Sequence, residues 1–367
     1  MTAGVALAHD YATQRGGAER VALVMAQAFP GAALYTTLYE PATTYPEFAA
    51  LDVRPSGIDR IGVLRRHHRA ALPFLAPAVS GTAPIDADVL LASSTGWAHG
   101  FRTTGRKVVY CHAPARWLYQ SDRYVGGGAR ALAYRGALGA LGPSLRRWDR
   151  AAAASADRYL VNSTTTAAAV RETYGIDAEV LPPPPALTPG GPETPVPGLE
   201  PGFVLCVARL LPYKNVDVVI DAVQAVPGLR LVVVGDGPDR DRLAARVRDA
   251  SRVQLLGRLP DEQLRWCYRA CSVLVAASYE DYGLSPLEAA SFGRPTVALR
   301  AGGYLDTLVE GTTGAFFDEP RADEVAAALE TATMHGWDET KLTSHADAFG
   351  AERFRARLRE VVAETAR

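Results

Sequence analysis

The chain has 367 residues, and its 39 Lys and Arg nearly balance 40 Asp and Glu, so a net charge of −1 gives no field that would attract nucleic acid. At 48% hydrophobic residues the composition excludes a disordered or collagen-like chain, and the length favours two domains. Because no apolar run approaches the ~18 residues that span a bilayer and the N-terminus lacks a signal-peptide pattern, we predict a cytoplasmic protein.

The first half of the chain predicts an α/β domain over residues 1–182. Short apolar runs predict strands at Val5–Ala8, Asp88–Ala92, Lys107–Cys111, Arg158–Val161 and Glu179–Leu181. Helical spacing predicts helices at Ala18–Phe29 and Thr164–Tyr174. The next residues, 183–202, are so rich in Pro and Gly that we expect a linker, because Pro fixes φ and removes a backbone donor.

The second half repeats this alternation over residues 203–349. Strands are predicted at Phe203–Ala208, Leu229–Val234, Val253–Leu256, Ser272–Ala277, Thr296–Leu299 and Ala315–Phe317. Helices are predicted at Val216–Ala225, Asp239–Arg248, Asp261–Arg269 and Ala322–Thr333. Residues 350–367 form an amphipathic helix that either ends this domain or packs back on the first. Alternating strands and helices imply parallel sheets, so the predicted architecture is two Rossmann-like lobes facing across a cleft.

Two cations follow the first strand of the second domain. The run FVLCVAR ends at Arg209, and Lys214 precedes the next predicted helix. Cations at the carboxyl end of a strand, beside a helix N-terminus whose N–H groups attract anions, suit a diphosphate. The alternative is a solvated surface pair, which is what an Arg and a Lys five residues apart more often form.

Two glutamates flank a turn in SYEDYGLSPLEAASFGRPTV. Glu280 and Glu288 lie between a predicted strand and a helix, and Gly283 lets the backbone turn sharply. Such a loop offers a carboxylate and several N–H groups to sugar hydroxyls and phosphate oxygens. For Glu288 a second interpretation is equally open, because residues 285–288 (SPLE) spell a capping box in which the glutamate serves its own helix.

Three further patterns have more ordinary explanations. Cys267 and Cys271 lie on one helix face, but no other Cys or His completes a zinc site, so we expect buried thiols. The Asp-x-Asp strings that start at Asp86 and Asp239 abut a buried strand and open a surface helix, and neither is predicted to bind metal. The basic amphipathic segment Ile58–Leu75 either rests on an anionic membrane or is an exposed helix that its prolines cut short.

Taken together, these motifs resemble those of a known family. Arg209 and Lys214, the GDGP turn at 235–238, the glutamate pair and the segment 302–317 look like the donor-binding half of retaining glycosyltransferases with the GT-B fold, family-four type. In the first domain, HDYATQRGGAERV (9–21), YCHAPARWLY (110–119) and YLVNSTTTAAAVRETYG (159–175) are similar to acceptor-side motifs of bacterial mannosyl- and glucosyltransferases in that family.

The resemblance implies a role for each matching side chain. Arg209 and Lys214 would bind the donor diphosphate, Glu280 the donor sugar hydroxyls, and Glu288 the nucleotide ribose. His112, after the strand KVVYC, matches the active-site histidine of the family, near the reacting sugar. His112 and Glu280 are therefore the predicted catalytic residues.

The resemblance also implies backbone contacts. Gly283, Leu284 and Ser285 would contact sugar and phosphate, and Gly16 and Gly17 would let first-domain N–H groups approach the diphosphate, unless they form a simple loop before a helix. A weaker acceptor-side set from the same motifs comprises Asp10, Tyr11 and Arg116. His9 and His99 are weaker histidine candidates, and Asp306 stands where the family commonly has Glu.

The implied activity is transfer of a hexose, of mannose or glucose type, from a nucleoside-diphosphate sugar to an acceptor hydroxyl with retention of configuration. No metal or other cofactor is expected, and the donor is GDP-mannose or a UDP-sugar. The acceptor (a sugar, a lipid-linked sugar or a small molecule) is not identified, and peripheral contact with the inner membrane face is a further expectation. Two alternatives stay open: a sugar-nucleotide epimerase of the same fold, and a non-catalytic nucleotide-sugar-binding protein.

Overall fold

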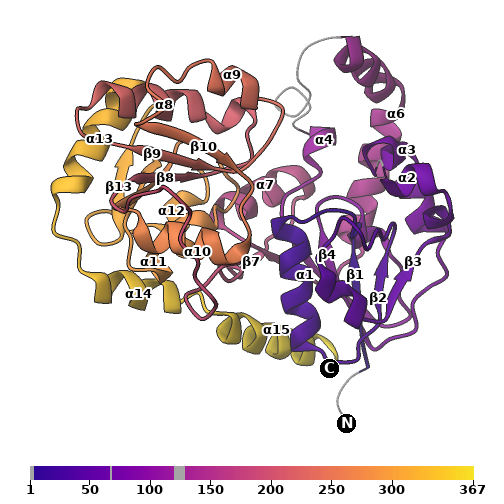
Figure 1. Cartoon of the computed structure of the whole chain (residues 1–367). Helices are drawn as coiled ribbons and strands as arrows, with labels where there is room; N and C mark the ends of the chain where they lie inside the picture. Colours follow the sequence, from indigo (N-terminus) through magenta and orange to yellow (C-terminus); the bar gives the residue numbers. More distant parts are fainter. Residues whose placement is uncertain (1–3, 67, 120–128) are drawn as a thin grey trace. The chain divides into compact units, whose positions relative to one another are not determined.

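The computed structural model describes residues 4–66, 68–119 and 129–367, and the chain divides into two compact units (Figure 1). Unit 1 comprises Met1–Pro183 and Ala351–Arg367, and unit 2 comprises Pro184–Gly350. Each unit contains one parallel sheet covered by helices, which confirms the predicted α/β class with two Rossmann-like lobes.

Seven parallel strands form the sheet of unit 1, in the order β3-β2-β1-β4-β5-β6-β7. Their bounds are β1 Val5–His9, β2 Leu34–Thr36, β3 Val53–Pro55, β4 Val89–Ser94, β5 Arg106–Cys111, β6 Arg158–Val161 and β7 Glu179–Val180. His9 pairs with Ser93 and Ser93 with Tyr110, so the carboxyl ends of β1, β4 and β5 lie side by side. Parallel sheets bind ligands at this edge.

Helices cover both faces of this sheet. The helices of unit 1 are α1 Gly17–Ala28, α2 Gly62–Arg66, α3 His68–Gly81, α4 Arg116–Tyr119, α6 Ala129–Ala154, α7 Thr164–Tyr174 and α15 Ala351–Thr365. Alternate strand residues feed two cores: Leu90 and Val109 pack with α3 and α7, whereas Leu91 and Val108 pack with α1 and α15. Both faces are apolar, as expected for a parallel sheet.

The last helix, α15, belongs to unit 1 although it follows unit 2 in the chain, and in Figure 1 it lies at the lower end of α1. Phe354 places its ring edge-on to Tyr110, with centroids 5.6 Å apart, and Leu358 is fully buried. Arg357 Nε donates to Glu179 Oε1 at 2.8 Å, which ties α15 to the edge strand β7. The amphipathic closing segment therefore completes a core of the first unit.

Unit 2 has six parallel strands in the order β10-β9-β8-β11-β12-β13. Their bounds are β8 Val204–Val207, β9 Leu231–Val234, β10 Val253–Gly257, β11 Val273–Ala276, β12 Thr296–Leu299 and β13 Gly314–Phe317. The helices are α8 Val216–Ala225, α9 Arg240–Ala244, α10 Asp261–Ala270, α11 Ser285–Ser291, α12 Tyr304–Thr307, α13 Ala322–Met334 and α14 Glu339–Asp347. One core lies under α8 and α13, and another lies under α10 and α11.

The elements differ from the sequence prediction in several places, and helices α6 and α14 were not predicted. Strands β2 and β3 were not predicted, because three residues are too few to show a period. Helix α9 ends at Ala244 rather than Arg248. The prediction that prolines cut the Ile58–Leu75 helix short is wrong, since α3 continues through Pro73 and Pro77. Burial of α3 residues such as Leu75 offsets the backbone hydrogen bonds that Pro removes.

Residues 183–202, where the composition predicts a linker, belong to unit 2 from Pro184 on. Leu187 is buried in the same core as Phe203, and the Thr194 N–H donates to the Glu262 carbonyl at 3.0 Å. Pro and Gly thus exclude regular structure here without excluding packing.

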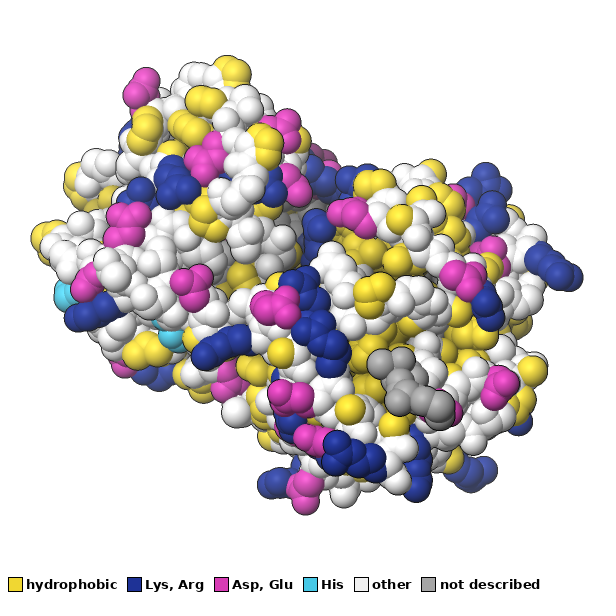
Figure 2. All heavy atoms as spheres, turned by 90° about the horizontal axis from the view of Figure 1, so that it is seen from below, with side chains coloured by type: hydrophobic (Ala, Val, Ile, Leu, Met, Phe, Trp, Pro, Cys, Tyr) yellow, Lys and Arg dark blue, Asp and Glu magenta, His cyan; other side chains and the backbone are white. Residues whose placement is uncertain are grey.

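Composition-based expectations agree with the packing. All four cysteines are buried and free, which confirms that Cys267 and Cys271 act as small core residues. No helix among the described residues is long and apolar enough to cross a membrane. On the face shown in Figure 2, basic and acidic side chains are interspersed rather than gathered by sign, in keeping with the near-zero net charge.

Candidate active site

At the carboxyl edge of the unit 2 sheet, the loops after β8 and β9 approach closely. The Ala208 N–H donates to the Val234 carbonyl at 3.0 Å. Gly235 has a φ of +135°, and a Cβ there would overlap the carbonyl oxygen of Ala208. The GDGP turn is therefore needed for backbone contact with the loop that carries Arg209.

Arg209 and Lys214 both lie at this edge, in different environments. The Arg209 side chain is exposed, and no hydrogen bond or ion pair joins it to a residue within the described ranges. Lys214 ends a 3₁₀ turn, after which Asn215 takes the left-handed conformation with φ 52°. The Asn215 side-chain amide donates to the Ala277 carbonyl at 2.8 Å, so the turn is tied to the end of β11.

Lys214 meets Glu280 in an ion pair between Nζ and Oε1. The two side chains are only 14% and 18% exposed. Ser278 Oγ donates to the same Glu280 oxygen at 2.6 Å, and the Tyr304 hydroxyl lies 3.3 Å from Ser278 Oγ. The structure thus joins the predicted diphosphate lysine to the predicted sugar-binding glutamate. It adds Ser278 as an orienting group that the sequence pattern did not reveal.

The loop between Glu280 and α11 is shaped by two glycines. Gly283 has a φ of +79°, and a Cβ there would overlap the Tyr304 ring. Gly302 has a φ of +63° and lies against the Glu280 carbonyl, which accepts a 2.8 Å hydrogen bond from the Gly303 N–H. The loop backbone is therefore fixed by the segment before α12.

Glu288 lies on α11 and is 9% exposed. Its Oε2 accepts a 2.6 Å hydrogen bond from the Tyr268 hydroxyl of α10. The capping-box interpretation fails, because Leu284 occupies the N-cap position and Ser285 already lies inside the helix. Burial, reinforced by the neighbouring carboxylate, raises the pKa of Tyr268 well above its usual value, so this hydroxyl keeps its proton and donates.

In unit 1, His112 follows β5 and lies beside the ends of β4 and β1. Its Nε2 is 2.9 Å from Ser93 Oγ, which in turn is 3.0 Å from His9 Nδ1. The Tyr110 ring contacts the His112 ring edge-on at 5.2 Å. His112 is half-buried. Burial lowers the pKa of His112 to about 3, and electrostatic repulsion from His9 and Arg116 lowers it further in the same direction. The imidazole is neutral at ordinary pH.

Gly16 and Gly17 open α1, with Gly16 as its extended N-cap at φ −134°. A Cβ on Gly16 would come within 2.5 Å of Glu19 Oε2. Glu19 is 2% exposed, and burial raises the pKa of its carboxyl to about 7. Gly16 thus makes room for a buried acid that the sequence pattern did not reveal.

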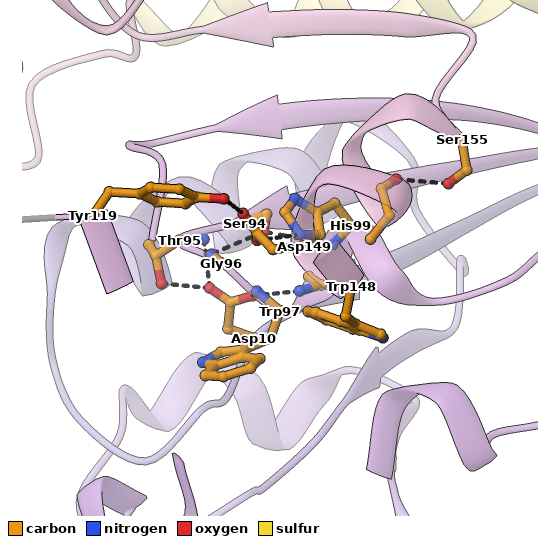
Figure 3. Close-up of polar contacts among 12 residues, drawn as sticks. Asp10, Ser94, Thr95, Gly96, Trp97, His99, Tyr119, Trp148, Asp149 and Ser155 are labelled. Carbon is orange, nitrogen blue, oxygen red and sulfur yellow. Dashed lines mark hydrogen bonds and ion pairs between the residues drawn. The ribbon is translucent and has the colours of Figure 1, made fainter. Parts of the chain in front are cut away.

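The three weaker acceptor-side candidates, Asp10, Tyr11 and Arg116, have different surroundings. Asp10 is 1% exposed, and its carboxylate accepts from the N–H groups of Thr95, Trp97 and Ala98 and from the Thr95 hydroxyl, at 2.5–3.0 Å (Figure 3). Four donors occupy its two oxygens, so Asp10 holds the loop after β4 rather than meeting an acceptor. Tyr11 packs against the core beside this loop.

Arg116 begins α4, and its charge contributes to the low pKa of His112. It therefore stays a candidate acceptor-side residue.

His99 belongs to a buried polar cluster instead of the strand edge (Figure 3). Its Nε2 lies 3.0 Å from Asp149 Oδ1, although the angle does not meet the geometry of a hydrogen bond. Both side chains are 1% exposed. Asp149 also accepts from the Tyr119 hydroxyl at 2.8 Å. His99 is thus a core residue, whereas His9 contacts the site.

In both Asp-x-Asp strings, an aspartate is engaged in contacts within the protein. Asp239 binds Arg242 through two 2.7 Å hydrogen bonds, and Asp88 accepts from the Gly4 N–H at 2.7 Å. Over the described part of the chain, no group of three or more His, Cys, Asp or Glu could hold a metal ion.

A pocket of about 550 Å³ lies in unit 1 beside Gly105 and Lys107, at the start of β5, whereas His112 follows the end of that strand. The Lys107 ammonium donates to the His99 carbonyl at 3.0 Å and to Ser155 Oγ at 2.8 Å. This pocket therefore lies at the opposite edge of the sheet from the candidate residues.

Two family models match the chain. The model described as Glycosyltransferase Family 4 matches residues 15–187, and the model described as Glycosyl transferases group 1 matches residues 195–344. A D-inositol 3-phosphate glycosyltransferase of Rhodococcus erythropolis is 33% identical over 204 residues, which cover 48% of this chain and 46% of that protein. The Acidothermus cellulolyticus protein of the same name is 30% identical, covering 51% and 52%. The chain spans about half the length of these curated relatives.

Solved structures share the whole fold. The Anabaena protein HepE, crystallised with UDP and glucose, aligns with a TM-score of 0.68 at 19% identity over 98% of this chain and 99% of its own. Sucrose-phosphate synthase from Thermosynechococcus elongatus aligns with a TM-score of 0.68 at 17% identity over 98% of each chain. With the two family models covering both units, the chain belongs to the glycosyltransferases of the family-four type with the GT-B fold.

Proposed function

We propose that this protein transfers a hexose from a nucleoside-diphosphate sugar to an acceptor hydroxyl, with retention of configuration and without a metal ion. The observation that carries the proposal is the arrangement at the carboxyl edge of the unit 2 sheet. There an exposed Arg209, the Lys214–Glu280 pair and the N-terminus of α8 lie within the matched glycosyl transferases group 1 region. Cations beside a helix N-terminus suit a diphosphate, and a carboxylate suits sugar hydroxyls.

The assigned roles follow from the charge that develops during transfer. When the sugar–phosphate bond breaks, the nucleoside diphosphate gains negative charge, which Arg209 and Lys214 would stabilise. Glu280, held by Ser278, would accept hydrogen bonds from donor hydroxyls, and Glu288 from the ribose. No carboxylate in these motifs is assigned as a nucleophile, so attack of the acceptor on the departure face accounts best for retention.

For the donor and the acceptor we propose classes of compound rather than single compounds. The donor proposal keeps GDP-mannose, which the first-domain motif favours, beside UDP-sugars. The curated relatives are named for D-inositol 3-phosphate, so an inositol phosphate joins sugars and lipid-linked sugars as an acceptor to be tested.

Membrane contact is proposed through the segment around α2 and α3. Ile61, Val63 and Phe74 are exposed, at 52%, 59% and 52%, in a segment that also carries Arg60 and Arg66. Exposed apolar side chains beside arginines suit an anionic lipid surface. Cosedimentation with vesicles of anionic and of neutral lipid tests this, and equal recovery with both would contradict it.

The proposed reaction is tested by incubating the chain with GDP-mannose, UDP-glucose and related donors, with and without acceptors. A transferase slowly hydrolyses one donor and glycosylates an added acceptor. An epimerase instead changes the sugar of the free nucleotide sugar, and a binding protein leaves every donor intact. Either of the last two outcomes would overturn the proposal.

A further inference from the structure

Three polar side chains form a continuous chain at the carboxyl edge of the unit 1 sheet. Ser93 Oγ bridges His9 Nδ1, at 3.0 Å, and His112 Nε2, at 2.9 Å. His9 and Ser93 are each 1% exposed, so solvent does not compete for these contacts. One hydroxyl carries one proton, and it can therefore donate to only one of the two imidazoles.

The Ser93 carbonyl decides the direction of the chain. Its oxygen lies 3.2 Å from the same His9 Nδ1, and a carbonyl oxygen can only accept. His9 Nδ1 therefore bears a proton and donates to the oxygens of Ser93. The reverse direction would turn the Nδ1 lone pair toward the carbonyl lone pairs in a buried site, which is unfavourable.

With His9 donating, the Ser93 hydroxyl still has its own proton to place, and among the described residues His112 Nε2 is the acceptor within its reach. Because Ser93 is buried, leaving this proton without an acceptor would be unfavourable. His112 Nε2 therefore accepts it, and the proton of the neutral ring lies on Nδ1. Among the residues that the structure describes, none hydrogen-bonds to His112 Nδ1, so this N–H is available to a ligand.

We propose that His9 and Ser93 are positioning residues that hold His112 as its Nδ1–H tautomer, presenting a hydrogen-bond donor to a substrate oxygen at the carboxyl edge of the unit 1 sheet. The inference rests on the proposed function in giving this edge a substrate, but the tautomer itself does not. A ring nitrogen that already bears a proton cannot take one from the acceptor hydroxyl, so His112 orients the substrate and does not act as a base.

Two-bond ¹H–¹⁵N correlation spectra of the full chain, with ¹⁵N-labelled histidine, measure the tautomer directly. The His112 signals are assigned by correlation to their own backbone and by their loss in His112→Gln. In the unmodified protein we expect the Nδ1–H pattern, with Nε2 as an unprotonated acceptor. An Nε2–H pattern would overturn the proposal, and this measurement does not depend on any variant folding.

Variants test the bridge. Ser93→Ala removes the donating hydroxyl, so His112 should shift to a mixture dominated by Nε2–H and turnover should fall about tenfold, as for one lost hydrogen bond. Ser93→Thr keeps a hydroxyl and should keep the tautomer. The matched control is Ser94→Ala, because Ser94 Oγ accepts from the Gly96 N–H at 3.1 Å and bonds to neither imidazole, while the Ser94 carbonyl, which accepts from the His112 N–H at 2.9 Å, is kept in the variant.

The outcomes separate the two proposals. An unchanged His112 tautomer in a folded Ser93→Ala variant refutes the bridge, whatever the enzyme does. If the tautomer shifts while His112→Ala keeps parental turnover, the bridge stands and the role of His112 in transfer fails. Loss of turnover in Ser93→Ala together with the Nε2–H shift, and not in Ser94→Ala, supports both.

Discussion

Changing the two partners of the Lys214–Glu280 pair separately should affect diphosphate binding in opposite directions. Lys214→Ala removes a cation that we assign to a phosphate oxygen. Glu280→Gln keeps the shape of the side chain, still accepts from Ser278, and releases Lys214 from its counter-charge. A pair that served only the fold would respond alike to both changes.

The structure sets the expected magnitudes. A hydrogen bond to a charged group contributes about 1.5–3 kcal/mol, which corresponds to roughly a 10- to 150-fold change in affinity. Because Glu280 pairs with Lys214, the diphosphate must compete with a carboxylate, and we expect Lys214→Ala to weaken binding by about tenfold. Glu280→Gln should bind the nucleoside diphosphate as tightly as the parent or more tightly, while turnover falls.

Isothermal titration calorimetry with UDP, GDP and the corresponding nucleosides measures these affinities. Nucleoside binding should not change in either variant, because the nucleoside lacks the diphosphate. The matched control is Lys341→Ala, whose ammonium lies 3.7 Å from Asp338 and is 68% exposed, and it should bind every ligand like the parent. If Lys214→Ala and Glu280→Gln both lower the melting temperature and neither alters diphosphate affinity, the pair is structural and the reasoning is refuted.

Other variants address the remaining assignments. Arg209→Ala should weaken nucleoside diphosphate binding roughly tenfold or more in the same titration, and parental affinity would place the phosphate site elsewhere. His112→Ala should cut turnover by about 100-fold or more in a donor-hydrolysis assay with nucleotide affinity unchanged, whereas near-parental turnover would make it a structural residue. Glu288→Gln should weaken nucleotide binding. Thermal melts with and without ligand separate weaker binding from a loss of stability. Tyr268→Phe, which removes the 2.6 Å hydrogen bond to Glu288, is the reference for a loss of stability alone. Activity should survive EDTA, and loss that magnesium or manganese restores would contradict metal independence.

The fold class was predictable because its signals are local. Each central strand is a short apolar run, and most of the helices between the strands repeat at helical spacing, so alternation alone indicated two parallel sheets. The edge strand β3 and its neighbour β2 were not predictable, since LYT and VRP carry no period. The end of helix α3 was mispredicted because the effect of proline on the backbone can be read from the sequence, whereas the core packing that outweighs this effect joins distant segments.

Site prediction succeeded where residues follow strand ends and failed where contacts join distant segments. Lys214 and Glu280 were predictable as separate candidates, but their ion pair depends on β8 lying beside β11. Ser93 carries no motif, and its place between His9 and His112 comes from the strand register. The capping-box interpretation of Glu288 failed because α11 begins at Ser285, which leaves Leu284, without a capping side chain, at the N-cap.

The return of α15 to unit 1 has a consequence for the order of folding during synthesis. Unit 2 is one continuous segment, so its core can close as soon as residue 350 has left the ribosome. Unit 1 must wait for Phe354, Leu358, Val361 and Val362, which fill the core beneath α1. The part of the chain made first is therefore completed last, and until then the portion of the apolar sheet face that α15 covers stays open to solvent.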